Sequence, residues 1–483
     1  MNPSGVFRLT SPGIILGAVA MAVAGASALA AISTEFAPGK FIPTFAICYS
    51  NAKGARSTEE TARFDMLVCS AGQRTAGVWG RNGRNSWQSL RALNPGIALA
   101  VYVMGPGEYN TADWGQMGEG WQWLKREHGK GAADRWIALG LKSGGYLQAV
   151  PYPNERLMEY TNANWHRYWC DTVYEDLWQG RKGVDYQGAD AVFSDNTSFQ
   201  VAWANQWRVE GAPQQPDMPT TFYVDGQWRH DLWQAGFFEF LTTAVPRFGS
   251  NGIRLVLNTG QLGRQPEVWR KLDDLANPPF AVMEEGGFVC PWGGDQKSFK
   301  FWDWERKLEP FSRLRHIKVL MCNHAGPFAG DGLAAMESPD ANGMTGWDAL
   351  WFSLASFLLG FDDVSRNGLM NFTIWGYSEY HWFDEFDPQY LHLGKARGSF
   401  TKKGPIHFRE FEDGWVAVNG ETKDAAGVNV PAGSARVLNH GNFKEWQEVP
   451  LVASFDLPAH RGVVLLREGR QPGNADNPAK HSL

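Results

Sequence analysis

The chain has 483 residues, and 45 Lys and Arg against 51 Asp and Glu give it a formal net charge of −6. Charged residues make up 20% and hydrophobic residues 43%, a balance typical of a globular protein rather than a disordered or multi-span membrane protein. The charges are spread along the chain without a long basic run, so we expect no binding of nucleic acid.

The first residues predict a secretory signal peptide. Arg8 precedes an uncharged stretch rich in Ala and Gly, Ser11–Ser33, and small residues at Ala26–Ala28 and Ala28–Ala30 are typical of a cleavage site. We therefore expect residues 1–30 to be a leader and the body to be secreted or periplasmic. The alternative is an uncleaved membrane anchor facing outside the cytoplasm, because the stretch approaches the roughly 20 residues that span a bilayer. Without such an anchor we expect no stable membrane association.

Eight short apolar runs, rich in β-branched or aromatic residues, follow one another along the chain. They are Phe41–Tyr49, Phe64–Ser70, Ile97–Met104, Ala189–Asp195, Ile253–Asn258, Phe280–Glu285, Ile317–Asn323 and Asn371–Trp375. Amphipathic helical patterns lie between them, at Trp87–Leu93, Trp165–Trp178, Leu232–Val245, Glu267–Ala276, Phe299–Leu314 and Trp347–Leu359. Eightfold alternation of strand and helix predicts a parallel (β/α)₈ TIM barrel, with a doubly wound open sheet as the alternative.

Two further regions differ from this alternation. Residues 105–188 form a long connection with many tryptophans, which we expect to fold as a lid or cleft wall, and residues 200–231 are a second candidate wall. From residue 396 to 468, short alternating runs separated by Gly, Pro, Asn and Asp predict a small antiparallel β-sandwich. We therefore expect a catalytic barrel over residues 31–395, the sandwich over 396–468 and a disordered polar tail over 469–483.

Acidic residues end two of the predicted strands. Aligning the apolar lead-ins Ala191–Phe193 and Ala281–Met283 puts Asp195 level with Glu285. Side chains alternate along a strand, so only one of Glu284 and Glu285 should point into the barrel mouth, and the alignment favours Glu285. The carboxyl ends of the strands of such a barrel meet on one face, where active sites are built.

A pair of carboxyl groups across a cleft is what glycoside hydrolysis requires, one ionised and one protonated. Asp195, with Asn196 beside it to supply hydrogen bonds, suits the ionised role. Glu285, near Gly286 and Trp292, suits the role of the acid if its surroundings are dry enough to raise its pKa. The competing interpretation is that either carboxylate is a helix cap or a salt-bridge partner.

These residues resemble a family. Gly188–Asn196, Val282–Gly286, Gly404–Asn419 and Leu457–Leu466 are similar to the motifs of an uncharacterised group of glycosyl-hydrolase-like (β/α)₈ barrels with an appended β-domain, relatives of the α-galactosidase and polygalactosaminidase barrels. The resemblance implies a nucleophile at Asp195 and an acid/base on strand six, hence a retaining mechanism. The paired glutamates leave Glu284 and Glu285 as the two candidates for the acid/base.

Aromatic and polar residues near the other strand ends are candidates for sugar binding. These are Tyr49, Tyr102, Tyr109, Asn196, Asn258, Trp292, Asn323, His324 and Trp375. The eleven His include no His-x-His and no His-Glu-x-x-His, so no metal site is expected and no cofactor is required. The sequence thus predicts a secreted or periplasmic retaining glycosidase acting on a polysaccharide or oligosaccharide. The alternatives are a carbohydrate-binding barrel without catalysis, and a metal-assisted polysaccharide deacetylase.

Overall fold

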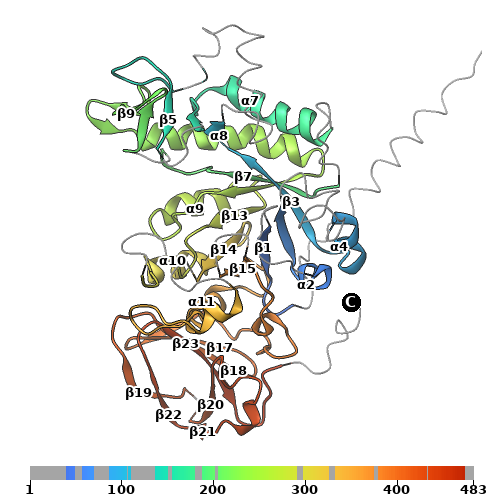
Figure 1. Cartoon of the computed structure of the whole chain (residues 1–483). Coiled ribbons are helices and arrows are strands. Elements are labelled where there is room, and N and C mark those ends of the chain that lie inside the picture. Colours follow the sequence, from blue (N-terminus) through green and yellow to red (C-terminus); the bar gives the residue numbers. More distant parts are fainter. Residues whose placement is uncertain are drawn as a thin grey trace, which may run out of the picture.

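The structure is a computed structural model of the chain (Figure 1). It describes residues 40–48, 57–69, 86–105, 107–109, 136, 138–150, 155–179, 188–201, 205–290, 297–325, 332–374, 379–431 and 433–473, with the backbone alone at 107–109, 176 and 177. The predicted leader and residues 474–483 of the predicted tail lie outside this part of the chain.

Eight parallel strands form the central sheet, and each falls on one of the predicted apolar runs. They are β1 (Phe45–Cys48), β2 (Met66–Cys69), β3 (Ala98–Met104), β7 (Ala191–Asp195), β12 (Arg254–Asn258), β13 (Ala281–Glu284), β14 (Lys318–His324) and β15 (Gly368–Thr373), hydrogen-bonded in this order. A parallel bridge between Thr44 and Met370, with the Met370 N–H donating to the Pro43 carbonyl at 2.8 Å, joins the last strand to the first. The predicted TIM barrel is therefore confirmed, and the open sheet is wrong.

Helices surround the barrel, and all of the α-helices below except α2 fall where the helical patterns predict them. They are α2 (Thr58–Ala62), α4 (Trp87–Leu93), α7 (Ala163–Asp171) continued by the π-helical turn η2 (Thr172–Trp178), α8 (His230–Gly249), α9 (Pro266–Asp273), α10 (Trp304–Phe311) and α11 (Gly346–Gly360), with short 3₁₀ turns η4 (Leu333–Glu337), η5 (Asp384–Phe386) and η6 (Trp446–Glu448). A capping box of Thr345 and Asp348 begins α11. None of the helices in the described part of the chain combines the length and the apolar character needed to cross a bilayer.

The two predicted cleft walls belong to one antiparallel sheet. Its strands are β4 (Gly107–Tyr109), β6 (Glu155–Leu157), β5 (Leu147–Ala149), β8 (Trp207–Val209) and β9 (Ala212–Pro216), beside a hairpin of β10 (Tyr223–Val224) and β11 (Gln227–Trp228). Figure 1 shows the β5 and β9 ends of this sheet beside α7 and α8 at one end of the molecule. Trp165 and Trp169 are fully buried against Phe240 of α8, so these tryptophans form core rather than a surface for ligand.

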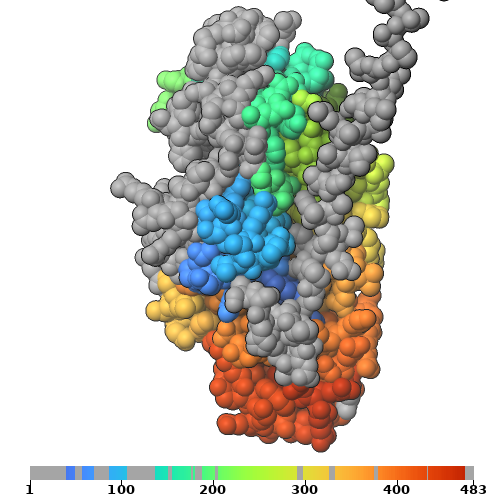
Figure 2. Space-filling model, turned by 90° about the vertical axis from the view of Figure 1, so that its right-hand side faces the viewer, coloured from blue at the N-terminus to red at the C-terminus, as the bar shows by residue number. Residues whose placement is uncertain are grey.

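The C-terminal region forms two antiparallel sheets at the opposite end of the molecule (Figures 1 and 2). One sheet contains β16 (Thr401–Lys403), β17 (Ile406–Glu410), β18 (Gly414–Asn419), β23 (Arg461–Arg467), β20 (Ala435–Leu438) and β21 (Leu451–Val452), and the other contains β19 (Ala425–Asn429) and β22 (Ser454–Leu457). They enclose a core of their own that includes Phe408, Trp415 and Leu465. Gly462 packs on α11, where an added Cβ would lie 2.7 Å from the Ala355 Cβ, so only glycine allows this approach.

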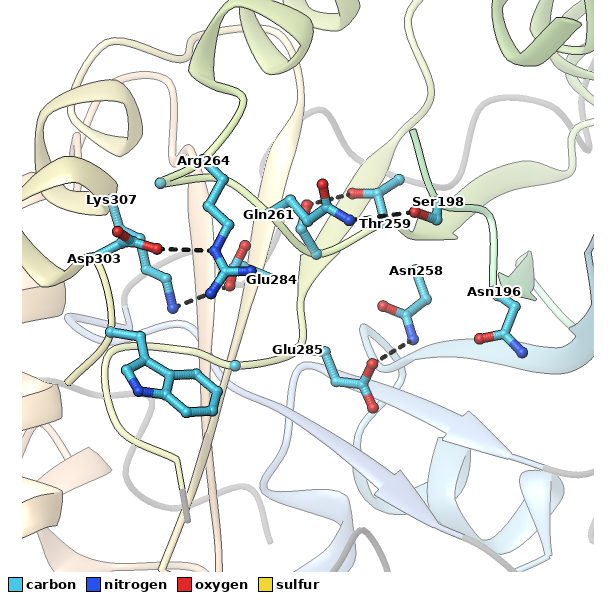
Figure 3. A pocket seen from close by; sticks show the side chains of 14 residues that line it. Asn196, Ser198, Asn258, Thr259, Gln261, Arg264, Glu284, Glu285, Asp303 and Lys307 are labelled. Carbon is cyan, nitrogen blue, oxygen red and sulfur yellow. Dashed lines mark hydrogen bonds and ion pairs between the residues drawn. The ribbon is translucent and has the colours of Figure 1, made fainter. Parts of the chain in front are cut away.

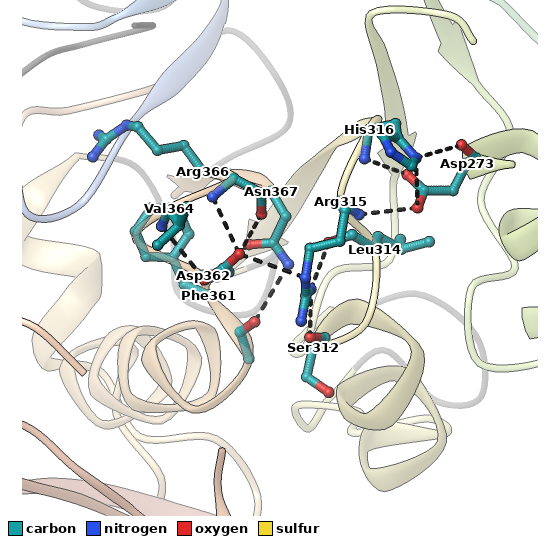
Figure 4. Close-up of polar contacts among 12 residues, drawn as sticks. Asp273, Ser312, Leu314, Arg315, His316, Phe361, Asp362, Val364, Arg366 and Asn367 are labelled. Atoms are coloured by element: carbon teal, nitrogen blue, oxygen red, sulfur yellow. Dashed lines mark hydrogen bonds and ion pairs between the residues drawn. The ribbon is translucent and has the colours of Figure 1, made fainter. Parts of the chain in front are cut away.

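Hydrogen bonds between a side chain and the backbone hold the amino-terminal end of β14 (Figure 4). The buried carboxylate of Asp273, at the end of α9, accepts three backbone N–H bonds, from Arg315 at 2.9 Å, His316 at 2.7 Å and Ile317 at 2.8 Å. These contacts fix the entry into β14, at the end of the barrel away from the acidic strand ends. Unpaired buried N–H groups are costly, so Asp273 is placed to stabilise the fold.

Candidate active site

At the carboxyl ends of the strands, the side chains that face into the barrel form one polar layer above the apolar interior. Ala100, Phe193, Val256, Met283 and Cys322 belong to the interior core. Because side chains alternate along a strand, the residues two positions further on also face inward. They are Tyr102, Asp195, Asn258, Glu285 and His324.

Both oxygens of Asp195 accept a hydrogen bond. The Tyr102 hydroxyl donates to Oδ2 at 2.6 Å, and the Asn258 amide donates to Oδ1 at 2.8 Å. The backbone of Asp195 is held as well, because the Gly105 N–H donates to its carbonyl at 2.8 Å. A Cβ on Gly105 would lie 2.4 Å from that carbonyl oxygen, so the close approach of β3 and β7 requires glycine at this position. Asp195 is therefore oriented and hydrogen-bonded as an ionised carboxylate needs to be.

Glu285 is joined to Asp195 through the same amide group. The Asn258 Nδ2 that donates to Asp195 at 2.8 Å also donates to Glu285 Oε2 at 3.1 Å (Figure 3). The two acceptor oxygens can therefore lie at most about 5.9 Å apart, the sum of those two distances. Burial, together with the charge of Asp195, raises the pKa of Glu285 to about 7. A carboxyl group with this pKa keeps its proton in mildly acidic to neutral solution.

His324 contacts the backbone of Glu285. Its Nε2 lies 3.2 Å from the Glu285 carbonyl oxygen, which can only accept, so Nε2 carries the proton and Nδ1 accepts from the Thr373 hydroxyl at 2.8 Å. Burial lowers the pKa of His324 to about 4, which keeps the ring neutral. His324 therefore bonds the backbone of the site and positions Glu285, and its contact with sugar stays a prediction.

Asn323 also has a different place from the predicted one. It faces outward from β14 and is fully buried, and its Oδ1 accepts from the Phe288 and Val289 N–H groups at 2.7 and 3.3 Å. Its amide nitrogen donates to two backbone carbonyls, one of them of Asn371 at 3.0 Å. The side chain is thus used to fix the loop after β13, and its contact with substrate stays a prediction. Its orientation follows from parity, because Asn323 and His324 cannot face the same side of β14.

Glu284 lies on the outer side of β13. Its carboxylate pairs with Lys307 of α10 at 3.1 Å and accepts the Leu262 N–H at 2.6 Å. Lys307 also donates to the Gly287 carbonyl at 2.5 Å. Glu284 therefore ties three segments together around the site, while Glu285 shares the hydrogen-bonded group with Asp195.

A third carboxyl group, Glu155 on β6, lies beside this pair and escaped the sequence analysis. Asn196, which adopts the left-handed φ of 52°, donates through Nδ2 to Glu155 Oε1 at 3.2 Å. Burial and the charge of Asp195 raise the pKa of Glu155 to about 8. Glu155 comes from a three-residue strand inside the long connection, where no motif or periodicity marks it. Burial and the charge of Asp195 thus raise the pKa of both neighbouring carboxyl groups, Glu155 and Glu285.

A pocket of about 310 Å³ opens at this end of the barrel (Figure 3). It is lined by Asn196, Ser198, Asn258, Thr259, Gly260, Gln261, Gly263, Arg264, Glu284, Glu285, Gly286, Trp302, Asp303 and Lys307. The predicted residues Tyr49, Trp292 and Trp375 and the side chain of Tyr109 lie outside the described residues. Within the part of the chain that is described, no three His, Cys, Asp or Glu side chains are grouped as a metal site.

Comparison with known proteins gives only distant structural similarities. No family model and no curated protein sequence matches the chain. Among solved structures, Amy13B of Eubacterium rectale has a TM-score of 0.45 at 10% identity, over 90% of this chain and 96% of that one. The trehalulose synthase MutB of Pseudomonas mesoacidophila has a TM-score of 0.46 at 11% identity, over 89% and 99%. A MutB mutant in complex with the substrate sucrose has a TM-score of 0.47 at 11% identity, over the same shares. We take no function from these similarities, and the functional argument rests on the geometry of the site.

Proposed function

We propose that this protein is a retaining glycoside hydrolase that acts on a polysaccharide or oligosaccharide, with Asp195 as nucleophile and Glu285 as acid/base. The observation that carries the proposal is the Asn258 amide, which bonds both carboxyl groups and limits their nearest oxygens to about 5.9 Å. Such a short distance between oxygens supports the carboxyl separation of retaining enzymes, roughly 5–5.5 Å, over the roughly 6.5–9.5 Å that inverting enzymes need to admit a water molecule.

The first step transfers the sugar to the enzyme. A carboxylate oxygen of Asp195 attacks the anomeric carbon, the bond from this carbon to the leaving oxygen breaks, and its electron pair stays on that oxygen. Glu285 gives its proton to the leaving oxygen, which suits a carboxyl group whose pKa is raised to about 7. The hydroxyl of Tyr102 and the amide of Asn258 orient the nucleophile.

The second step releases the sugar with the original anomeric configuration. Glu285, now a carboxylate, takes a proton from a water molecule whose oxygen attacks the anomeric carbon. The ester bond to Asp195 breaks, and both carboxyl groups return to their starting states. Because Glu285 acts as acid and then as base, a pKa near the working pH serves both steps.

The proposal is tested by following new reducing ends released from a panel of bacterial and plant polysaccharides. The wild type is compared with Asp195→Asn and Glu285→Gln, and Glu284→Gln serves as the matched control because it neutralises the neighbouring carboxylate. We expect activity to be lost in the first two variants and retained by folded Glu284→Gln. If no polysaccharide is cut, or if Asp195→Asn is fully active on one that is, the mechanism fails and glycan binding without cleavage becomes the function to test.

The proposed location is outside the cytoplasm. Residues 1–30 support it through their uncharged Ala- and Gly-rich stretch and the small residues before Ala31. N-terminal sequencing of the protein from the periplasm or medium tests this location, and a mature chain that starts at Met1 contradicts cleavage of the leader.

A further inference from the structure

The pocket continues beyond the proposed catalytic pair to a second group of side chains. Figure 3 shows Glu285 with Asn196 to one side and with Arg264 and Asp303 to the other. Trp302 lines the same pocket and keeps 43% of its surface exposed. Among the residues that the structure describes, Trp302 is the one exposed tryptophan, whereas Trp165, Trp169, Trp207, Trp233 and Trp269 are fully buried.

The residues before and after Trp302 are both anchored, which fixes the backbone from which its indole extends. On one side, the ring of Phe301 stacks on His460 with centroids 3.8 Å apart and an interplanar angle of 12°. On the other side, Asp303 adopts a left-handed φ of 54° and receives Arg264 Nε at 3.1 Å and Arg306 at 3.3 Å. A ring on such a fixed backbone loses little freedom when a ligand stacks on it.

Paired charges line the pocket together with this indole. Arg264 lies 3.1 Å from Asp303, and Lys307 lies 3.1 Å from Glu284. Charges that pair with one another attract an anionic ligand less than an excess of cations would, which favours a neutral sugar over a uronic acid or a phosphate. An apolar face with hydrogen-bonding groups at its edge matches a pyranose ring, which has apolar faces and hydroxyl groups at its rim.

We propose that Trp302, Arg264 and Asp303 form the subsite for the leaving-group sugar, in which a neutral pyranose stacks on Trp302 and its hydroxyls bond the Arg264–Asp303 pair. This subsite rests on the proposed function: Glu285, as the acid, protonates the oxygen of the leaving sugar, so that sugar must lie beside Glu285. Glu285 lines the pocket between Asn258 and this group, whereas Asp195 is not among the lining residues. The substrate class that follows is an oligosaccharide or polysaccharide of neutral sugars, cleaved with a sugar on each side of the bond.

A binding experiment tests the subsite without turnover. In the Asp195→Asn background, migration through gels containing soluble xylan, β-glucan, galactan or starch is compared with and without Trp302→Ala. We expect one of these polysaccharides to retard the protein and Trp302→Ala to weaken the retardation about tenfold in apparent affinity, which corresponds to one aromatic stacking contact. Trp302→Phe keeps an aromatic face and should restore most of the retardation. The control is Val364→Ala, which truncates a residue that is 92% exposed at the far end of the barrel.

A kinetic experiment locates the contact on the leaving-group side. Two substrates are compared: the polysaccharide, whose leaving group is a sugar, and the 4-nitrophenyl glycoside of the same sugar, whose leaving group is 4-nitrophenol. Trp302→Ala should lower kcat/KM on the polysaccharide about tenfold more than kcat/KM on the 4-nitrophenyl glycoside. An equal change of kcat/KM on both substrates, or unchanged retardation with Trp302→Ala, overturns the subsite while the proposed hydrolysis stands. If the wild type cuts none of the polysaccharides but is retarded by one of them, and Trp302→Ala removes this retardation, the proposed hydrolysis is overturned. In that case the contact of Trp302 with the glycan is supported.

Discussion

Glu285 should make the protein less stable as the pH rises, and Glu285→Gln should remove this dependence. Burial and the charge of Asp195 raise its pKa from 4.5 to about 7 in the folded state. Between these two values the folded protein holds a proton that the unfolded chain has lost, so the free energy of unfolding falls as the pH rises. Gln at this position keeps the oxygen that accepts from Asn258 and has no proton to lose.

The size of the effect follows from the shift. A difference of about 2.5 pKa units at about 1.36 kcal/mol each corresponds to about 3 kcal/mol, fully lost above the folded pKa. Glu285→Gln should therefore be more stable than the wild type by about 3 kcal/mol at pH 9 and close to it at pH 5. A more stable Glu285→Gln variant at pH 9 would show that Glu285 lowers the stability of the folded protein. This is expected of a residue that serves catalysis, as proposed for the acid/base.

The assay is urea unfolding of both proteins at pH 5 and pH 9, followed by tryptophan fluorescence. The matched control is Glu284→Gln, which leaves the buried Lys307 without its partner at 3.1 Å and should lose about 3 kcal/mol at pH 9, the opposite sign. If Glu285→Gln changes stability equally at both pH values, or is less stable than the wild type at pH 9, Glu285 is not a protonated carboxyl group and the reasoning is refuted.

Four further outcomes are expected. In the wild type, kcat/KM should fall about tenfold per pH unit above pH 7 as Glu285 loses its proton, and a flat profile to pH 9 contradicts this. Asn258→Ala removes a hydrogen bond that lowers the pKa of Glu285, so the fall of kcat/KM should begin at a higher pH than in the wild type. If the fall begins at the same pH, the hydrogen bond from Asn258 to Glu285 does not affect this pKa. Glu155→Gln should also be more stable than the wild type at pH 9, by urea unfolding, because its pKa is raised to about 8. Asp273→Ala leaves three backbone N–H groups unpaired and should cost about 3 kcal/mol in urea unfolding with kcat of the folded enzyme unchanged, whereas a lower kcat would link this end of the barrel to the site.

The barrel could be predicted because its strands are buried on both sides. Such strands are continuous apolar runs, and all eight predicted runs overlap observed strands, although β15 begins three residues before the predicted run Asn371–Trp375. The alternation that favours Glu285 over Glu284 also holds, since Met283 belongs to the interior core and Glu284 pairs with Lys307 outside it. The same rule, applied to β14, would have separated His324 from Asn323.

The remainder of the site could not be predicted, because it comes from segments without a pattern. Glu155 lies on a strand of three residues, too short to show alternation, and it reaches Asp195 only because β6 joins a sheet built from two distant connections. Trp302 is one of 23 tryptophans, and nothing in the neighbouring sequence distinguishes an exposed indole from a buried one. Both positions depend on contacts between residues far apart in the chain.

Buried carboxyl groups have different roles at the two ends of the barrel: they stabilise the fold at the amino-terminal end and form the candidate active site at the carboxyl end. At the amino-terminal end, the carboxylate of Asp273 is matched by three N–H donors and its burial stabilises the fold. At the carboxyl end, Glu155, Asp195 and Glu285 are close enough that the charge of Asp195 raises the pKa of the other two. Three such groups cannot all ionise at low cost, so Glu155 and Glu285 hold their protons to higher pH than an exposed carboxyl group does. A raised pKa is what an acid requires, and it arises from burial and proximity alone.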